Sequence, residues 1–135
     1  MARVLLADDD PTSRLTLQTV LRAGGYAVDA AASAAEAVGM LDEQEYELVL
    51  SDLEMETPES GLKVLAHAKM MGYKPATALV AVSHNGETSQ GTGERTRQVL
   101  IAPEDVPELL GRVADLISER AQRRLERELR LTSVA

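Results

Sequence analysis

The sequence predicts an α/β domain in which helices doubly wind a five-stranded parallel sheet. Three observations predict this fold class. Short apolar runs recur along the 135 residues, amphipathic segments separate most of them, and the runs themselves are almost uniformly apolar. Strands that alternate with helices imply right-handed crossovers and therefore parallel pairing. Nearly uniform apolar strands indicate a sheet that is covered on both faces.

Caps and breakers delimit the expected helices. Pro11 favours a helix start, with Thr12 or Ser13 near it. Ser33 followed by Glu36 three residues later is a capping-box pattern. The chain therefore divides, in order, into strand 4–7, a helix from 11 to the glycines at 24–25, strand 26–31, helix 33–41, strand 47–51, helix 61–71, strand 77–82 and strand 99–101.

The fourth crossover and the end of the chain depart from this regular alternation. Residues 85–94 are polar and rich in Gly, which opposes a helix, so we expect a mobile loop with a degenerate fourth helix. Residues 104–131 predict one long helix, because apolar residues advance by three or four positions at Leu110, Val113, Ile117, Ala121, Leu125 and Leu129. Covering the sheet needs only about half of that length. We therefore expect a domain at 1–118 and a helical extension at 119–135.

The extension has two interpretations. It is either a dimer or partner helix, which would cover its exposed leucines, or a linker to a further domain. Residues 112–135 carry 6 basic and 4 acidic residues, whereas residues 1–111 carry 8 basic and 18 acidic residues. The extension therefore differs in charge from the acidic body of the chain.

Composition limits the function classes. The net charge is −8 and Phe and Trp are absent, which argues against direct nucleic-acid binding. The absence of Cys excludes disulfides, thiolate metal ligands and a cysteine nucleophile. No apolar stretch has membrane-spanning length and no signal peptide is present, so we expect a cytoplasmic protein without a membrane partner.

Carboxylates follow two of the expected strands. Asp8, Asp9 and Asp10 come directly after the first strand, and Asp52 comes directly after the third. The carboxyl ends of parallel strands share one edge of a sheet, where ligands of open α/β folds bind. Clustered carboxylates require a compensating cation, and a set of oxygen ligands suits Mg²⁺. Each residue taken singly could equally well just begin a loop, but the pairing of two strand ends favours a shared site.

These residues resemble the receiver domain of bacterial response regulators. The resemblance covers about residues 2–118 and rests on residues 4–11 (VLLADDDP), 48–55 (LVLSDLEM), Gly61 and residues 80–83 (VAVS). It implies a flavodoxin-like fold and a signalling role in a two-component system. The partners would be a histidine kinase or phosphotransfer protein and a downstream protein.

The resemblance also implies roles for individual residues. Asp52 would be the phosphoacceptor, and Ser83 would bond the phosphoryl group and signal its presence. Asp8, Asp9 and Asp52 would hold Mg²⁺ together with the main-chain carbonyl of Glu54. Taken without the family, Ser83 reads more simply as a hydroxyl that caps the turn after a strand.

Several positions depart from the family pattern. Ala102 stands before Pro103 where the family has a Lys, Val99 stands where it has an aromatic residue, and His84 follows the sensing hydroxyl where a small residue is usual. His84 is either a solvated loop residue or a gate that carries charge when protonated. The lost Lys weakens the coupling between phosphate and the rest of the domain.

Three function classes therefore remain to be compared. One is a receiver that relays phosphorylation of Asp52, and the alternative is an atypical receiver that serves as a phosphorylation-independent interaction or dimerisation module. A Mg²⁺-dependent phosphohydrolase is disfavoured, because the short chain offers no later acidic motif and no Lys after Lys74. The missing Gly-x-x-x-x-Gly-Lys run excludes a P-loop. We expect a signalling domain, not an enzyme.

Overall fold

The computed structural model describes residues 1–53, 55–82, 98–101 and 105–133. Its elements, in chain order, are β1 (Arg3–Ala7), α1 (Pro11–Ala23), β2 (Ala27–Ala31), α2 (Ala34–Glu43), β3 (Leu48–Asp52), α3 (Ser60–Lys69), β4 (Ala76–Val82), β5 (Gln98–Ile101) and α4 (Val106–Ser133). Every expected strand is present within about one residue of its predicted start. The expected loop and degenerate helix at 85–94 lie outside the described residues.

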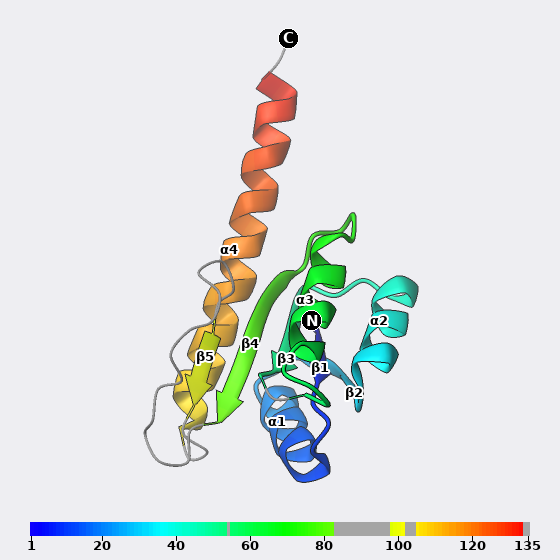
Figure 1. Cartoon of the computed structure of the whole chain (residues 1–135). Helices are drawn as coiled ribbons and strands as arrows, with labels where there is room; N and C mark the ends of the chain where they lie inside the picture. Colours follow the sequence, from blue (N-terminus) through cyan, green and yellow to red (C-terminus); the bar gives the residue numbers. More distant parts are fainter. Residues whose placement is uncertain (54, 83–97, 102–104, 134–135) are drawn as a thin grey trace.

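The five strands form one parallel sheet in the order β2-β1-β3-β4-β5, which confirms the predicted fold class. Helices cover both faces of the sheet (Figure 1). Side chains alternate across β1, so that Val4 and Leu6 pack with α1 and α4 while Leu5 and Ala7 pack with α2 and α3. The core is thus two aliphatic layers, one on each side of the sheet.

The predicted capping residue is confirmed for α2 and corrected for α1. Ser33 accepts from the backbone N–H of Glu36 at 3.1 Å, as the capping box predicts, while the Glu36 carboxylate accepts from the N–H of Ala32. At α1 the cap is Asp10, not Thr12 or Ser13. Its carboxylate accepts from the N–H of Ser13 at 3.0 Å, and Pro11 is the first helical residue.

Helix α4 extends well beyond the sheet (Figure 1). Leu109, Val113 and Leu116 are buried against the sheet, whereas Leu125 and Leu129 are 56% and 58% exposed. The 28 residues of α4 span about 42 Å, at 1.5 Å per residue. The arrowheads of β4 and β5 point away from the projecting end, so the extension leaves the domain at the amino edge of the sheet (Figure 1).

The expectation of one apolar face along the whole of α4 was wrong. Each step of four residues overshoots a helical turn by about 40°, so a series of such steps drifts around the helix. Leu125 and Leu129 consequently lie about 120° and about 160° around the helix from Val113, away from the buried face. The buried face continues instead with Arg120, whose guanidinium donates to the carbonyls of Tyr73 at 2.7 Å and Lys74 at 2.9 Å. No helix within the described ranges is long and apolar enough to cross a membrane.

Candidate metal centre

Three carboxylates meet at the carboxyl edge of the sheet. Each of Asp8, Asp9 and Asp52 offers an oxygen, and these oxygens all lie within 4.8 Å of one another. The register explains why they meet: Ala7 at the end of β1 is the partner of Ser51 in β3, so the next residues, Asp8 and Asp52, leave the sheet side by side. The sequence prediction that the two strand ends share a site therefore agrees with the geometry.

Asp8 is the most constrained of the three. Its side chain is fully buried, its N–H donates to the carbonyl of Ala31 at 3.0 Å, and its Oδ1 accepts from the N–H of Asp10 at 3.0 Å. Its Oδ2 has no hydrogen-bond partner within the described part of the chain. A buried carboxylate oxygen without a partner is costly. A divalent cation bound between the three carboxylates would supply the missing partner, so the donor set fits Mg²⁺.

Asp52 is the last residue of β3 and is half-buried. The pairing of the two strands continues just past it, because the N–H of Leu53 donates to the carbonyl of Val80 at 2.9 Å. On its other side lies the start of α3. A Cβ added at Gly61 would lie 2.7 Å from the carbonyl oxygen of Asp52 and 3.2 Å from Ser51 Oγ. The backbone of Asp52 therefore lies between β4 and α3. Helix α3 can approach this closely because residue 61 is Gly, which has no Cβ.

The structure separates the roles of the three consecutive aspartates. Asp9 is exposed and contributes to the carboxylate cluster, whereas Asp10 is committed to capping α1. Sequence reasoning missed Arg14, whose guanidinium donates to the main-chain carbonyl of Asp8 at 3.0 Å. Arg14 lies one turn after Asp10, and residues four apart share a helix face. This spacing could have predicted that Arg14 lies near the acidic residues. Arg14 brings one positive charge close to the acidic cluster.

Several predicted site positions lie outside the described residues. These are the carbonyl of Glu54, the hydroxyl of Ser83, His84 and the Ala102-Pro103 pair. Val99 lies in β5, but nothing is described of its side chain. The roles of these residues stay predictions.

The family model for the response regulator receiver domain matches residues 4–114. The chain belongs to the response regulator receiver family. Receiver domains are signalling domains of two-component systems and are not enzymes, as predicted. Phosphorylation on Asp and binding of Mg²⁺ at an acidic pocket are general features of this family.

Relatives support the same assignment. The chain is similar to the two-component response regulator ARR11 of Arabidopsis thaliana, with 36% identity over 90 residues, which are 65% of this chain and 16% of that protein. It is 30% identical to the transcriptional regulatory protein GlrR of Escherichia coli over 121 residues, which are 89% of this chain and 27% of that protein. The chain thus spans less than a third of either relative.

A solved receiver supports the fold. The response regulator protein TrrA of Thermotoga maritima, described in complex with Mg²⁺ and BeF, superimposes with a TM-score of 0.67 at 25% identity. The match covers 86% of this chain and 99% of that structure. The receiver fold thus accounts for most of the chain, and the family match ends well before the end of α4.

Proposed function

We propose that this receiver accepts a phosphoryl group on Asp52 from a histidine kinase or phosphotransfer protein and relays it to a downstream protein. The proposal rests on the cluster that the carboxylates of Asp8, Asp9 and Asp52 form. One buried oxygen of Asp8 in this cluster has no hydrogen-bond partner in the described part of the chain. The Mg²⁺–BeF complex of the similar receiver TrrA supports a phosphoryl site of the same type.

The chemistry assigns one task to each residue. An oxygen of the Asp52 carboxylate forms a bond to phosphorus as the bond to the donor's nitrogen breaks, and the electron pair leaves with that nitrogen. Asp8 and Asp9, with the carbonyl of Glu54, would hold Mg²⁺, which offsets the repulsion between carboxylate and phosphoryl oxygens. Ser83 would donate to a transferred oxygen. Burial of Asp8 fixes the direction from which its oxygen reaches the cluster.

Incubation with acetyl phosphate and Mg²⁺, followed by intact-mass measurement, tests the proposal. We expect one added phosphoryl group in the natural chain and none in Asp52→Asn. Asp10→Asn is the matched control, because it removes the same charge nearby from a residue that caps a helix. A natural chain that stays unmodified, or an Asp52→Asn chain that takes up the group, would contradict a phosphoacceptor role for Asp52.

A second candidate function is a phosphorylation-independent interaction module. Ala102 favours it, because the family Lys that reads phosphate is absent there. Hydrogen exchange with and without phosphorylation separates the two functions. A relay predicts altered protection in β4, β5 or α4, whereas a module predicts the same protection in both states.

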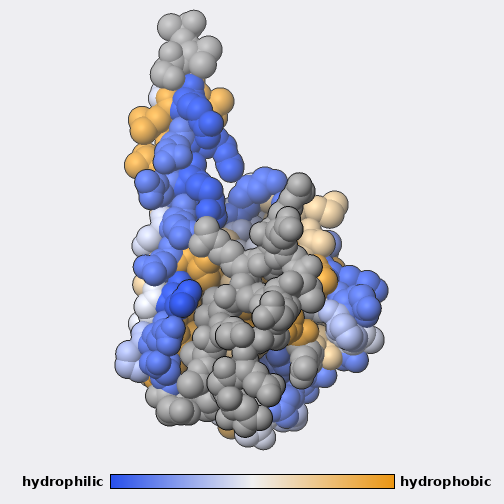
Figure 2. Space-filling view, turned by 60° about the vertical axis from the view of Figure 1, so that its left-hand side comes forward, coloured by the Kyte–Doolittle hydropathy of each residue, from blue (hydrophilic) through white to orange (hydrophobic). Residues whose placement is uncertain are grey.

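The extension at 119–135 is proposed as a contact between two copies of the chain. Its exposed Leu125 and Leu129 lie on the side of α4 that faces away from the sheet, and apolar groups are visible on the projecting end among polar ones (Figure 2). Nearby charges alternate in sign, for example Arg124 and Glu128 at 3.8 Å. A second α4 would cover these leucines by the pairing that two amphipathic helices use.

Sedimentation velocity over a range of concentrations tests this contact. We expect a dimer that becomes a monomer in Leu125→Glu and Leu129→Glu. Leu15→Glu is the control, since Leu15 is an exposed leucine of α1 at 66% and lies outside the extension. A monomer at every concentration, or equal disruption by Leu15→Glu, would exclude the dimer helix.

A further inference from the structure

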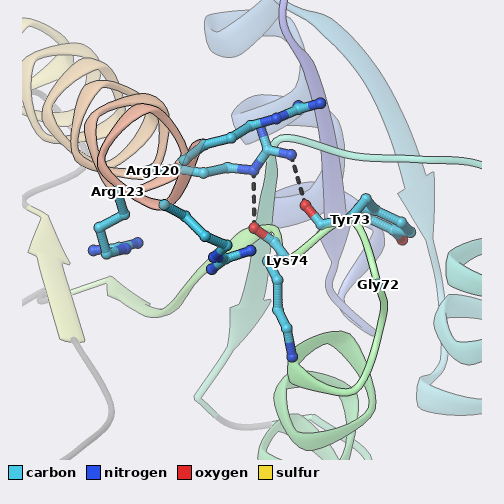
Figure 3. A pocket seen from close by; sticks show the side chains of 7 residues that line it. Gly72, Tyr73, Lys74, Arg120 and Arg123 are labelled. Atoms are coloured by element: carbon cyan, nitrogen blue, oxygen red, sulfur yellow. Dashed lines mark hydrogen bonds between the residues drawn. The ribbon is translucent and has the colours of Figure 1, made fainter. Parts of the chain in front are cut away.

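Basic side chains gather at the amino edge of the sheet, the edge opposite the carboxylate cluster. The turn between α3 and β4 and the projecting part of α4 enclose two adjoining hollows of about 110 and 300 Å³. The smaller is lined by residues 72–74 and four arginines, and no acidic residue of the described ranges lines it (Figure 3). The cationic residues of the two hollows together, here called the basic cleft, are Lys69, Lys74, Arg120, Arg123, Arg124 and Arg127.

This concentration of positive charge is unusual within this chain. The net charge is −8, yet among the described residues six cations and one acidic residue, Glu119, line the two hollows. Arginines three or four residues apart on one helix face repel each other. Burial lowers the pKa of Arg120, and the charges of Arg124 and Arg123 lower it further, while Glu47 and Glu45 act in the opposite direction. A bound anion would relieve that repulsion.

The cations of the basic cleft differ in what they contact. Arg120 is structural, because it donates to the carbonyls of Tyr73 and Lys74 and so fixes α4 against the turn (Figure 3). Arg123 and Arg127 line both hollows, whereas Arg124 lies 3.8 Å from the carboxylate of Glu128. Guanidinium groups that line one hollow suit phosphate oxygens, which they bind in a bidentate manner.

The turn holds a further cation in an uncommon conformation. Lys74 has φ +47°, the left-handed region that a side chain other than Gly rarely adopts. Its N–H donates to the carbonyl of Met71, and its Nζ donates to the carbonyl of Lys69 at 3.2 Å. A glycine would satisfy the same backbone with less strain. Lys74 instead places an ammonium group at the cleft, and strained residues of this kind cluster at ligand-binding sites.

We propose that the basic cleft binds a small molecule carrying closely spaced phosphate groups, a diphosphate being the simplest. The ligand class follows from the cleft itself. Its hollows are small and concave, and the cations come from both the turn and the helix. A ligand with adjacent phosphates can contact Lys74, Arg123 and Arg127 together. The site is separate from Asp52, so ligand binding there does not require phosphorylation.

Calorimetric titration of the full chain with pyrophosphate in Mg²⁺-free buffer tests this inference. We expect saturable binding that weakens about tenfold or more in the double variant Arg123→Gln/Arg127→Gln, since each charge-assisted pair contributes to affinity. Arg112→Gln is the matched control, because Arg112 is an exposed arginine of the same helix paired with Glu108, away from the cleft. It should bind pyrophosphate as the natural chain does.

A second variant separates binding from folding. Lys74→Gly removes a cation while its backbone conformation favours Gly, so we expect weaker pyrophosphate binding in a chain that unfolds at no lower temperature. Three results would overturn the inference: no saturable binding, an equal response to KCl at matched ionic strength, or equal affinities for the double variant and Arg112→Gln. Binding of a single-stranded oligonucleotide in the absence of pyrophosphate binding would also overturn it, by indicating a polymer ligand.

Discussion

Replacing Asp8 by Asn is expected to stabilise the metal-free protein and to abolish its stabilisation by Mg²⁺. The Asp8 carboxylate is fully buried, and its Oδ2 has no partner among the described residues. The carboxylates of Asp9 and Asp52 lie close by and add like-charge repulsion. Replacing the carboxylate by an amide removes one negative charge, and the amide N–H groups can donate hydrogen bonds to the carboxylates of Asp9 and Asp52. The gain in unfolding free energy should be about 1–3 kcal/mol, the usual cost of an unsatisfied buried polar group.

Thermal unfolding with and without Mg²⁺ measures both effects. In the natural chain Mg²⁺ should stabilise by about 2.7 kcal/mol when its concentration is 100 times the dissociation constant. In Asp8→Asn this stabilisation should vanish, because the variant lacks one of the three carboxylates. Asp10→Asn is the control, since Asn caps helices as well as Asp does and should leave both quantities nearly unchanged. A destabilised Asp8→Asn protein that still responds to Mg²⁺ would contradict the assignment of the metal centre.

Replacing Gly61 by Ala is expected to destabilise the fold by about 1–3 kcal/mol, as overpacking does, and to slow phosphorylation. The added Cβ would lie 2.7 Å from the carbonyl oxygen of Asp52, a distance that forces a shift. The atom it meets belongs to the backbone, so it cannot rotate away as a flexible side chain could. Either α3 or the end of β3 must therefore move. A movement of β3 would displace Asp52, the proposed phosphoacceptor.

Chemical denaturation of two Gly→Ala variants isolates this steric effect. Gly39 lies at an exposed position inside α2, and a Cβ there would meet no atom of the described residues within 4 Å. Gly39→Ala should therefore stabilise by about 0.5–1 kcal/mol, because Ala favours the helix and restricts the unfolded chain. The two substitutions should therefore change the free energy of unfolding in opposite directions. A neutral or stabilising Gly61→Ala would show that the approach of α3 to Asp52 is not constrained.

The sheet and the carboxylate cluster were predictable because both follow from local patterns. Apolar runs define strands, and two strand ends with acidic residues must meet if the strands are adjacent and parallel. The assignment of Asp10 to the helix cap was less accessible, since three consecutive aspartates offer equivalent ligands until the backbone geometry selects one as the cap. The close approach at Gly61 depends on tertiary packing between α3 and β3, which no local pattern encodes.

The end of α4 shows the limit of periodicity as a predictor. Steps of three or four residues were read as one stripe, but the angular drift of successive four-residue steps places Leu125 away from the buried face. The buried face is continued by Arg120, a polar residue that the apolar pattern ignored and that binds two main-chain carbonyls of the α3–β4 turn. Sequence patterns find apolar burial well, whereas they miss a charged side chain that is anchored to backbone carbonyls.

The most direct test of the central claim, that Asp52 is a Mg²⁺-dependent phosphoacceptor, is to locate the phosphoryl group on the chain. After incubation with acetyl phosphate, borohydride reduces an aspartyl phosphate to homoserine, and peptide mass spectrometry then identifies the modified residue. We predict homoserine at Asp52 alone, and none when Mg²⁺ is withheld or when Asp8 is replaced by Asn. Homoserine at Asp8, Asp9 or Asp10, or modification of Asp52 without Mg²⁺, would contradict the account.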